Sequence, residues 1–515
     1  MGVRLLLIVL IVLLPGCRSI PTRPSIDLKT EERSAAFFPF FNLPWFQYRR
    51  DFGKVNAWEH VGASSAAPAM AKSFAALHQA GVKGVVWFLL ADGGAAPNFD
   101  SEGRIRGLDP LFLTDLKAAL TIAEENQISV VWVLMDHLWM KPAELSGSAQ
   151  LFGHSRLIED VSQQQLFLDK VLDPILTVAS NSRSTAGWIV MNEPEIALNE
   201  GWVNEQQLFS FLNAVASRIR QNRATAAISI GHADIESLID FTNNYPEAPI
   251  SFLSFHHYRN YMPPAVARIR RTIGDSRKPI YIGEFNWNEP SLPHMELDLQ
   301  SIIAGSYQLG YAGIWPWSLN PKEGAAPASI NVKEYAALVR ESEKFPEVPN
   351  LFEKAAEGAL YQVETWRQEL ELHRSQIAEN TQKLLETKRL LVQIEPELAK
   401  RSAELEKAQS ANQRLVTALT ESRSKLARLR WLPWASQDLA LEQANEKQLQ
   451  ARMDVSKNGT TWLEEANANF KKSDVEFNAQ RNWKKLYEMR IRGNQFQLTA
   501  KQRHMKLTRQ IYNLP

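Results

Sequence analysis

The stretch Trp188-Ile189-Val190-Met191-Asn192-Glu193-Pro194-Glu195 decides how the rest of the chain is interpreted. It begins as an apolar run, which is the pattern of a strand buried on both faces. It then delivers a polar Asn-Glu-Pro where that strand should end. A second stretch, Pro279-Ile280-Tyr281-Ile282-Gly283-Glu284-Phe285, repeats the design, because it is a short apolar run that ends in one carboxylate. Two strands are therefore predicted to present one glutamate each at their carboxyl ends.

Short apolar runs alternate with longer amphipathic segments between residues 37 and 345. The eight predicted strands lie at 37–48, 81–90, 128–135, just before 193, 226–230, 250–255, just before 284, and 312–317. Eight strand–helix units over about 300 residues favour an α/β fold of the (β/α)₈ barrel type over an open doubly wound sheet. No Gly-rich phosphate loop follows any predicted strand, which counts against a nucleotide-binding fold. In such a barrel, functional groups gather at the carboxyl ends of the strands.

The composition is that of a globular protein with more than one domain. The chain has 515 residues, of which 45% are hydrophobic and 22% charged, and this length suggests two or three domains. The formal net charge is +1, so no global field favours nucleic acid as a partner.

The first residues are typical of an export signal, not of a folded element. An apolar segment at 5–14 follows Arg4 and is shorter than the roughly 20 residues that a membrane-spanning helix needs. It ends Leu14-Pro15-Gly16-Cys17, which resembles a bacterial lipobox. We therefore expect a lipoprotein signal peptide at 1–16 and lipidation of Cys17, with an ordinary cleaved signal and an incidental cysteine as the alternative. Cys17 is the only cysteine, so no internal disulfide is possible.

A polar segment at 17–36 is expected to act as a tether between the lipid anchor and the barrel. Arg18, not Asp, follows the cysteine, and by resemblance to Gram-negative lipoproteins this favours the outer membrane. The expected location is therefore the bacterial cell envelope, on the outer membrane and facing the periplasm.

Residues 346–430 carry a heptad repeat that predicts a coiled coil. One apolar seam recurs at strict seven-residue spacing: Val363, Leu370, Ile377, Leu384, Leu391, Leu398, Leu405, Asn412, Leu419 and Leu426. The companion position is weaker and includes His373, Asn380 and Thr387. Pro396 lies inside the run and is expected to kink or break the helix near Glu395. Asn412 either fixes the register or is a tolerated polar position.

The tail at 431–515 is predicted to be helical, with few turn signals. Between Arg481 and Arg509 it carries nine Lys/Arg residues and one Glu, which is either a basic face for an anionic partner or a solvated helix surface. The coiled coil either associates with a second copy or folds back, at Pro396 or Pro433, onto the tail of the same chain. Intramolecular packing is favoured because the tail has no other evident core.

The strand-end motifs together resemble a known enzyme family. Asn192-Glu193-Pro194, then His256-x-Tyr258 two strands later, Gly283-Glu284 on the next strand and a Trp-rich eighth strand resemble the clan A glycoside hydrolases, with family 5 the nearest. The resemblance covers about residues 37–345. It implies that Glu193 is the general acid/base, that Glu284 is the nucleophile, and that the reaction retains anomeric configuration through a glycosyl-enzyme. The chemistry agrees, because two nearby carboxylates can hold one proton between them.

The same resemblance assigns further contacts. It implies that Asn192 holds the sugar 2-hydroxyl, that Tyr258 orients the nucleophile and that His256 contacts substrate. His257 should face the other side of the strand and be structural. Trp317, with Trp315 as the alternative, is expected to be the platform beneath the sugar, although tryptophans in barrel strands are also commonly core. By position alone, the residues at other strand ends are cleft candidates: Asp136, His137, Asp92, Trp139 and His232.

Two features bear on the strength of the assignment. Many clan A enzymes carry an arginine on the second strand, and the run Gly84-Val85-Val86-Trp87-Phe88 has none. A metal site built from His137, His232 and His256 lacks local ligand spacing, so neither a metal nor another cofactor is expected.

Two functions follow from these observations. The first is a membrane-anchored retaining glycosidase acting on a β-linked polysaccharide, and a transglycosylase would share every residue named. The second is a catalytically weak, glycan-binding scaffold lipoprotein whose coiled coil docks an envelope or exopolysaccharide assembly.

Overall fold

The computed structural model describes residues 26–29, 37–54, 60–146, 149–259, 261–274, 277–285, 298–319, 331–430, 436–457 and 460–515. The chain divides into two compact units. The first comprises Met1–Ile196, Glu205–Tyr361 and Lys506–Pro515, and the second comprises Ala197–Asn204 and Gln362–Met505. The predicted signal peptide at 1–16, Cys17 and most of the tether at 17–36 lie outside the described residues.

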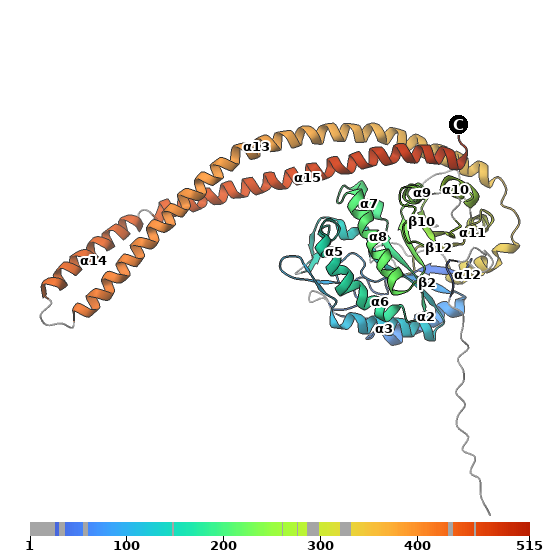
Figure 1. The fold of residues 1–515 in the computed structure, drawn as a ribbon, viewed down its shortest axis with the longest axis horizontal. Coiled ribbons are helices and arrows are strands. Elements are labelled where there is room, and N and C mark those ends of the chain that lie inside the picture. Colours follow the sequence, from blue (N-terminus) through green and yellow to red (C-terminus); the bar gives the residue numbers. More distant parts are fainter. Residues whose placement is uncertain are drawn as a thin grey trace, which may run out of the picture. The chain divides into compact units, whose positions relative to one another are not determined.

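Eight parallel strands form the sheet of the first unit, and their order in the sheet follows the chain. They are β1 (Phe40–Asn42), β2 (Gly84–Phe88), β5 (Ser129–Asp136), β8 (Thr185–Asn192), β9 (Ile228–His232), β10 (Leu253–His257), β11 (Ile280–Phe285) and β12 (Gly313–Pro316). The first and last strands meet: the Leu319 amide donates to the Asn42 carbonyl at 2.8 Å, just beyond β12. The Tyr335 hydroxyl bridges them too, since it lies 3.0 Å from the Phe40 carbonyl and 2.5 Å from that of Ile314. The expected (β/α)₈ barrel is confirmed (Figure 1).

Helices connect the strands, as parallel pairing requires. They are α2 (Ala67–Ala80), α3 (Pro110–Glu125), α4 (Arg156–Glu159), α5 (Val161–Phe167), α6 (Asp173–Ala179), α7 (Pro194–Asn199), α8 (Glu205–Asn222), α9 (Ile235–Asn244), α10 (Val266–Thr272), α11 (Leu299–Gln308) and α12 (Val332–Glu341). A π-helical turn, η2 (Leu168–Leu172), joins α5 to α6, and the short 3-10 helices η1 (His137–Met140) and η3 (Ser342–Lys344) follow β5 and α12. Side-chain caps set several starts: Asp109, Asp234 and Asp298 each accept a bond from an amide in the first turn.

The N-terminal end of the barrel is filled by apolar side chains. Leu28, only 1% exposed, packs in a cluster with Ile189, Phe252, Tyr281 and Trp315. The Tyr281 hydroxyl donates to the Leu28 carbonyl at 3.2 Å. Leu28, in the described segment 26–29, therefore helps to close the end of the barrel opposite the carboxyl ends of the strands.

Two β-hairpins interrupt the alternation and were not predicted. One pairs β3 (Asn98–Phe99) with β4 (Ile105–Gly107), and the other pairs β6 (Glu144–Ser146) with β7 (Ala149–Leu151). They follow β2 and β5, so they extend the loops at the carboxyl ends of those strands. In a (β/α)₈ barrel, these loops shape the site.

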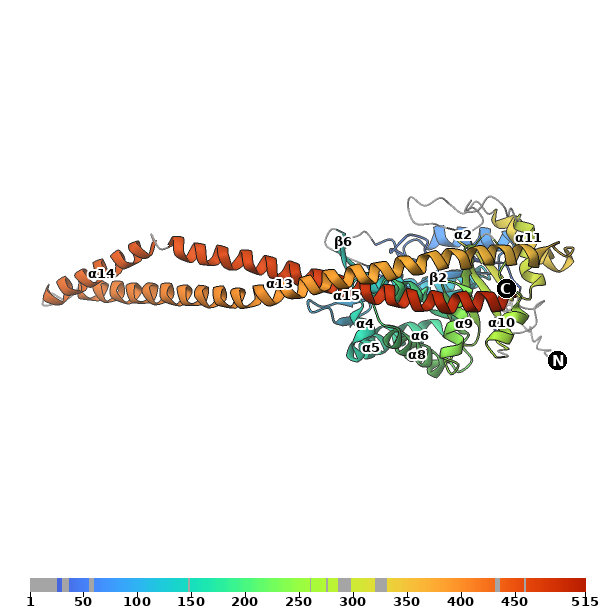
Figure 2. The same cartoon turned by 90° about the horizontal axis from the view of Figure 1, so that it is seen from above.

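Three long helices make up the second unit and its links to the first: α13 (Leu351–Leu429), α14 (Ser436–Lys457) and α15 (Thr460–Tyr512). Trp366 packs on His504 with ring centroids 5.8 Å apart, and His373 Nδ1 lies 2.9 Å from Asn494 Oδ1. Farther along, the Ser422 hydroxyl donates to Glu442 at 2.7 Å. Partner numbers fall as α13 numbers rise, so α13 pairs antiparallel with α15 and then α14 (Figures 1 and 2).

Both heptad positions of α13 contribute buried side chains to this pairing. Val363, Leu370, Leu419 and Leu426 on the predicted seam are buried, and so are the companion polar residues His373, Asn380, Thr387 and Ser422. Asn412 is exposed, so it does not set the register of this pair. The coiled coil itself, and any self-association through it, stay predictions.

Of the kink or break predicted near Glu395, the break is wrong, because α13 continues through Pro396. Proline removes one helical hydrogen bond, at a cost of ~3 kcal/mol in a helix interior. Pro396 and its neighbour Glu395 are exposed, so water can satisfy the carbonyl that loses its partner. The helix is also long enough to continue on both sides of the defect.

Candidate active site

The sheet register brings the predicted residues together at the carboxyl ends of neighbouring strands. Asp136 on β5 pairs with Asn192 on β8, and His256 on β10 pairs with Glu284 on β11. The ladder slips between Phe255 and His256 and again at the ends of β8 and β11. Such irregularities are common at barrel rims, where they re-aim side chains toward a site.

Glu193 follows β8 in a left-handed backbone conformation, with φ of 47°. For a residue with a Cβ this costs roughly 1–2 kcal/mol, and it persists only where the surroundings fix it. Here the Glu193 amide donates to the Gly231 carbonyl at 2.6 Å, and Pro194 starts α7 immediately afterwards. The Glu193 carboxylate Oε1 lies 2.8 Å from His256 Nδ1.

Glu284 lies within β11 and is more deeply buried. Its side chain is 5% exposed, against 17% for Glu193. Glu284 Oε2 accepts a hydrogen bond from the Tyr258 hydroxyl at 2.6 Å and lies 3.3 Å from His256 Nδ1. The preceding residue, Gly283, packs closely against β10, where a Cβ would lie 2.3 Å from Ser254 Oγ. Tyr258 thus has the contact that its predicted role of orienting the nucleophile requires. His256, predicted to contact substrate, lies against both carboxylates, and its contact with substrate stays a prediction.

The two carboxylates are closely spaced. One oxygen of Glu193, one oxygen of Glu284 and one ring nitrogen of His256 all lie within 4.8 Å of one another. Retaining glycosidases place their carboxyl groups about 5–5.5 Å apart, whereas inverting enzymes leave about 6.5–9.5 Å for a water molecule. The spacing fits a carboxylate that attacks the sugar directly.

Burial and charge give the three groups different proton affinities. Burial, with a contribution from the charge of Glu193, raises the pKa of Glu284 to about 8. Burial opposes the charged form of His256, but the attraction of Glu284 and the hydrogen bond to Glu193 outweigh it and raise the pKa of His256 to about 9. Burial likewise opposes ionisation of Glu193, yet the hydrogen bond and charge of His256 hold its pKa below the ordinary value. At neutral pH the three groups therefore share two protons.

Asn192 is oriented by Asp136. The Asn192 amide Nδ2 donates to Asp136 Oδ2 at 3.1 Å, and Asp136 Oδ1 accepts from the Leu138 amide at 2.9 Å. His137 Nδ1 lies 3.2 Å from Asp136 and 3.9 Å from Glu193 Oε2. The structure therefore brings Asp136 and His137 to the site, where Asp136 fixes the amide that the resemblance assigns to the sugar 2-hydroxyl.

The two tryptophans of the eighth strand occupy different environments. Trp317 is half-buried just beyond β12 and makes edge contacts with Trp45 and Phe88. Trp315 is 1% exposed and stacks on Phe40, so the alternative assignment of Trp315 to substrate is wrong: it is core. Trp139 is likewise fully buried, with its Nε1 donating to the Ala91 carbonyl at 2.9 Å.

His257 and His232 are structural neighbours of the site. Burial lowers the pKa of His257 to about 4, and its Nε2 contacts the Tyr261 carbonyl, as expected for the opposite strand face. His232 Nδ1 lies 2.5 Å from Glu195 Oε1. Within the described ranges, the one cluster close enough to hold a metal ion is Glu193, His256 and Glu284, which includes neither His137 nor His232.

Two groups near these strand ends were not predicted from the sequence. The Glu195 carboxylate contacts the His232 ring. The sequence feature that could have indicated this group is the second carboxylate, two residues after Glu193. Beyond β1, Tyr48 donates to Asp92 Oδ2 at 2.6 Å, and the Arg49 guanidinium also binds Asp92. Arg49, in the loop after β1, therefore binds a carboxylate just beyond the end of β2.

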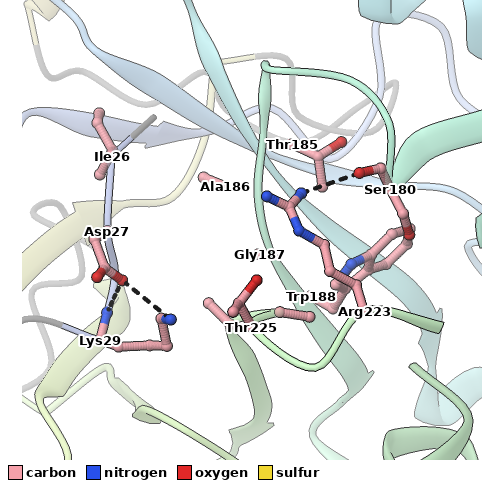
Figure 3. Close-up of a pocket in the computed structure, with 12 residues that line it drawn as sticks. Ile26, Asp27, Lys29, Ser180, Thr185, Ala186, Gly187, Trp188, Arg223 and Thr225 are labelled. Carbon is pink, nitrogen blue, oxygen red and sulfur yellow. Dashed lines mark hydrogen bonds and ion pairs between the residues drawn. The ribbon is translucent and has the colours of Figure 1, made fainter. Parts of the chain in front are cut away.

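A separate cavity of about 260 Å³ lies at the opposite end of the barrel, beside the start of β8 (Figure 3). Its lining includes Lys29, Thr185, Trp188 and Arg223. The Arg223 guanidinium donates to the Ser180 carbonyl at 3.0 Å. Thr185 begins the strand that Asn192 ends, so this cavity is remote from the paired carboxylates.

Comparison with known proteins points to one class of enzyme. No protein-family model matches the chain. The mannan endo-1,4-beta-mannosidase of Mytilus edulis is 24% identical over 322 residues, which cover 54% of this chain and 82% of that protein. The enzyme of the same name from Cryptopygus antarcticus is 22% identical over 328 residues, covering 55% and 80%.

Among solved structures, the beta-1,4-mannanase of the sea hare Aplysia kurodai is 21% identical. The match covers 61% of this chain and 94% of that one, with a TM-score of 0.47. The two sequence relatives, which this chain matches over 82% and 80% of their lengths, are both named mannan endo-1,4-beta-mannosidase.

Proposed function

We propose that this protein is a retaining glycoside hydrolase that cleaves β-1,4-linked mannan. The observation that carries the proposal is the pair Glu193 and Glu284, with oxygens within 4.8 Å at the carboxyl ends of two barrel strands. The two sequence relatives named as mannan endo-1,4-beta-mannosidases support the sugar and the endo mode of cleavage.

In this reaction the Glu284 carboxylate attacks the anomeric carbon while Glu193 donates a proton to the departing oxygen. Water then hydrolyses the glycosyl-enzyme, with Glu193 as the general base. The Tyr258 hydroxyl, 2.6 Å from Glu284, holds the nucleophile in place. Asn192, oriented by Asp136, is available to bond the sugar 2-hydroxyl, where such bonds strengthen in the transition state.

The reaction needs its proton on Glu193, whereas burial in the unliganded site favours it on Glu284. In both cases the site holds two protons, one on His256 and the other on either Glu193 or Glu284. The second proton can therefore move between the two glutamates without exchange with solvent. His256 Nδ1 lies between the carboxylates, 2.8 Å from one and 3.3 Å from the other. Substrate binding therefore has only to redistribute protons over distances of one hydrogen bond.

The experiment is turnover of mannohexaose and of a panel of β-glucans, mannans and xylans, with products identified by mass. Glu193→Ala and Glu284→Ala are the matched controls. We expect the parent chain to release shorter β-1,4-mannosides from mannohexaose and mannan, and neither variant to release them. Binding of mannan that survives both substitutions, without turnover by the parent chain, would contradict hydrolysis and favour the glycan-binding scaffold. Products longer than the mannohexaose supplied would identify a transglycosylase instead, because only transfer to a sugar acceptor can lengthen the chain.

We also propose that the protein is held at the bacterial outer membrane, facing the periplasm, by lipid on Cys17. The lipobox-like Leu14-Pro15-Gly16-Cys17 and the Arg18 that follows support this. No helix in the described part of the chain is both long and apolar enough to cross a membrane. Metabolic labelling with a fatty acid should mark the parent chain but not Cys17→Ala. Equal labelling of both chains, or of neither, would contradict the anchor.

A further inference from the structure

Both residues that flank Tyr258 are fixed by buried partners. Arg259 binds Glu236 through two hydrogen bonds, of 2.9 Å and 2.7 Å. Glu236, in the first turn of α9, is fully buried. On the other side, the His257 ring contacts the Tyr261 carbonyl. The hydroxyl that holds Glu284 therefore projects from a backbone segment tied down on both sides.

The last turns of α15, residues 506–512, complete this network and belong to the barrel unit. The Thr508 hydroxyl donates to Glu236 Oε1 at 2.6 Å, and Thr508 is fully buried. The Tyr512 ring packs edge-on against Tyr261, with centroids 5.9 Å apart, and its hydroxyl lies 3.3 Å from the Met262 carbonyl. Figures 1 and 2 both place the C-terminus beside α9 and α10.

The Thr508 hydroxyl matters because a buried ion pair is sensitive to its surroundings. The Coulomb attraction between Glu236 and Arg259 has to offset the desolvation of both ions, and it does so only when further hydrogen bonds satisfy the remaining lone pairs. Thr508 supplies one such bond to the carboxylate. Without it, Glu236 is left with an unsatisfied lone pair, and the Arg259 side chain is held less tightly.

We propose that the C-terminal turn of the chain is a positioning element of the active site, in which Thr508 acts through Glu236 and Arg259 to hold Tyr258 on the nucleophile. The proposal rests on the proposed function for its kinetic consequence, although its structural consequence does not depend on turnover. Thr508 and Tyr512 touch no reacting group, so they are positioning residues. The active site is thereby complete only when residues 506–512 are packed against Glu236 and Tyr261 within the barrel unit.

The test compares Thr508→Val, which keeps the volume and removes the hydroxyl, with Thr508→Ser, which keeps the hydroxyl. Thr499→Val is the matched control on the same helix, because Thr499 is exposed and its hydroxyl bonds only the Gln495 carbonyl. In the full-length chain we expect Thr508→Val to lower kcat on mannohexaose about tenfold, which corresponds to ~1.4 kcal/mol. KM should change less than about twofold, since no substrate contact is lost. Thr508→Ser and Thr499→Val should match the parent.

Hydrogen–deuterium exchange gives a second measurement that does not require activity. In Thr508→Val, peptides covering 253–262 should exchange faster, while those covering β5 should not. A purely structural role for Thr508 would lower the melting temperature but leave kcat and this local exchange unchanged, and that result would overturn the proposal. If the parent chain does not turn over mannohexaose, the proposed function fails, and the exchange measurement alone decides whether Thr508 anchors the Tyr258 segment.

Discussion

The ends of β8 and β11 come from the same sequence design, an apolar run that closes on one glutamate, yet the fold gives the two glutamates different surroundings. Glu193 lies past its strand in a left-handed conformation, is 17% exposed and contacts His256. Glu284 lies inside its strand, is 5% exposed and is held by Tyr258. The more accessible carboxylate is suited to exchange protons with a leaving group or water, and the fixed one to attack. Because both strand ends share one sequence design, the surroundings of each carboxylate distinguish the two roles.

Replacing each glutamate separately should give the largest effects and should separate the two roles. Glu284→Ala should lower kcat roughly 10⁴-fold or more on every mannoside, because no group remains to form the glycosyl-enzyme. Glu193→Ala should lose as much on mannohexaose. It should keep far more glycosylation activity on an aryl mannoside whose leaving group needs no proton. Burst kinetics on the two substrates would measure the glycosylation rate of each variant. Equal losses in both variants on both substrates would contradict the separate roles of the two glutamates.

The two tryptophans of the eighth strand extend the comparison to another repeated pattern. Trp315→Ala should destabilise the barrel by ~3–5 kcal/mol, because it empties a core site between Phe40 and Tyr281. Trp317→Ala should cost less stability and raise KM, because Trp317 is half-buried near the site. Thermal unfolding and steady-state kinetics on mannohexaose measure the two effects. A stable Trp315→Ala chain with raised KM would reverse the assignment.

Tyr258→Phe removes the hydroxyl that bonds Glu284 and leaves both glutamates in place. A hydrogen bond to a charged group contributes ~1.5–3 kcal/mol, so kcat should fall roughly 10- to 100-fold. The loss should persist with the activated aryl mannoside, because Tyr258 serves the nucleophile and not the proton donor. A loss seen only on mannohexaose would instead place Tyr258 with Glu193.

The pH dependence should show the shared protons directly. Both Glu284 and His256 have raised pKa values, about 8 and about 9, so the site holds two protons below pH 8 and loses the first as pH rises through about 8. Because the reaction needs both protons, kcat/KM on mannohexaose should fall about tenfold per pH unit above that point. A profile that stays flat to pH 10 would contradict the shared-proton arrangement.

Much of the barrel was predictable from the sequence, because the patterns of its strands and helices are local. The surroundings of individual side chains were not predictable in this way. Buried parallel strands and amphipathic helices can be recognised from their own residues, and Glu193, Glu284, Asn192, His256 and Tyr258 follow from where strands end. Alternation could not separate Trp315 from Trp317, since residues two apart share a strand face. The two residues differ in their position along the strand: Trp315 lies within β12, and Trp317 lies just past its end.

Longer-range partners explain the remaining differences. Thr508 and Glu236 are 272 residues apart, and no local pattern connects them. The polar companion residues of α13 predict only a weak seam, yet they are buried. The partner helices supply polar groups that bond two of them: Asn494 of α15 lies against His373, and Glu442 of α14 accepts from Ser422. Whether Pro396 breaks α13 depends on its exposure to water, and the sequence pattern does not determine that exposure.

Trapping the glycosyl-enzyme tests directly whether Glu284 attacks the sugar and Glu193 transfers the proton. The full-length chain is incubated with 2-deoxy-2-fluoro-β-mannosyl fluoride, a mannoside with a good leaving group whose fluorine slows the second step, and is then digested and analysed by peptide mass. We predict one fluoromannosyl group on Glu284, formed also in Glu193→Ala because the leaving group needs no acid. A label on Glu193, or no label while mannohexaose is still cleaved, would contradict the account.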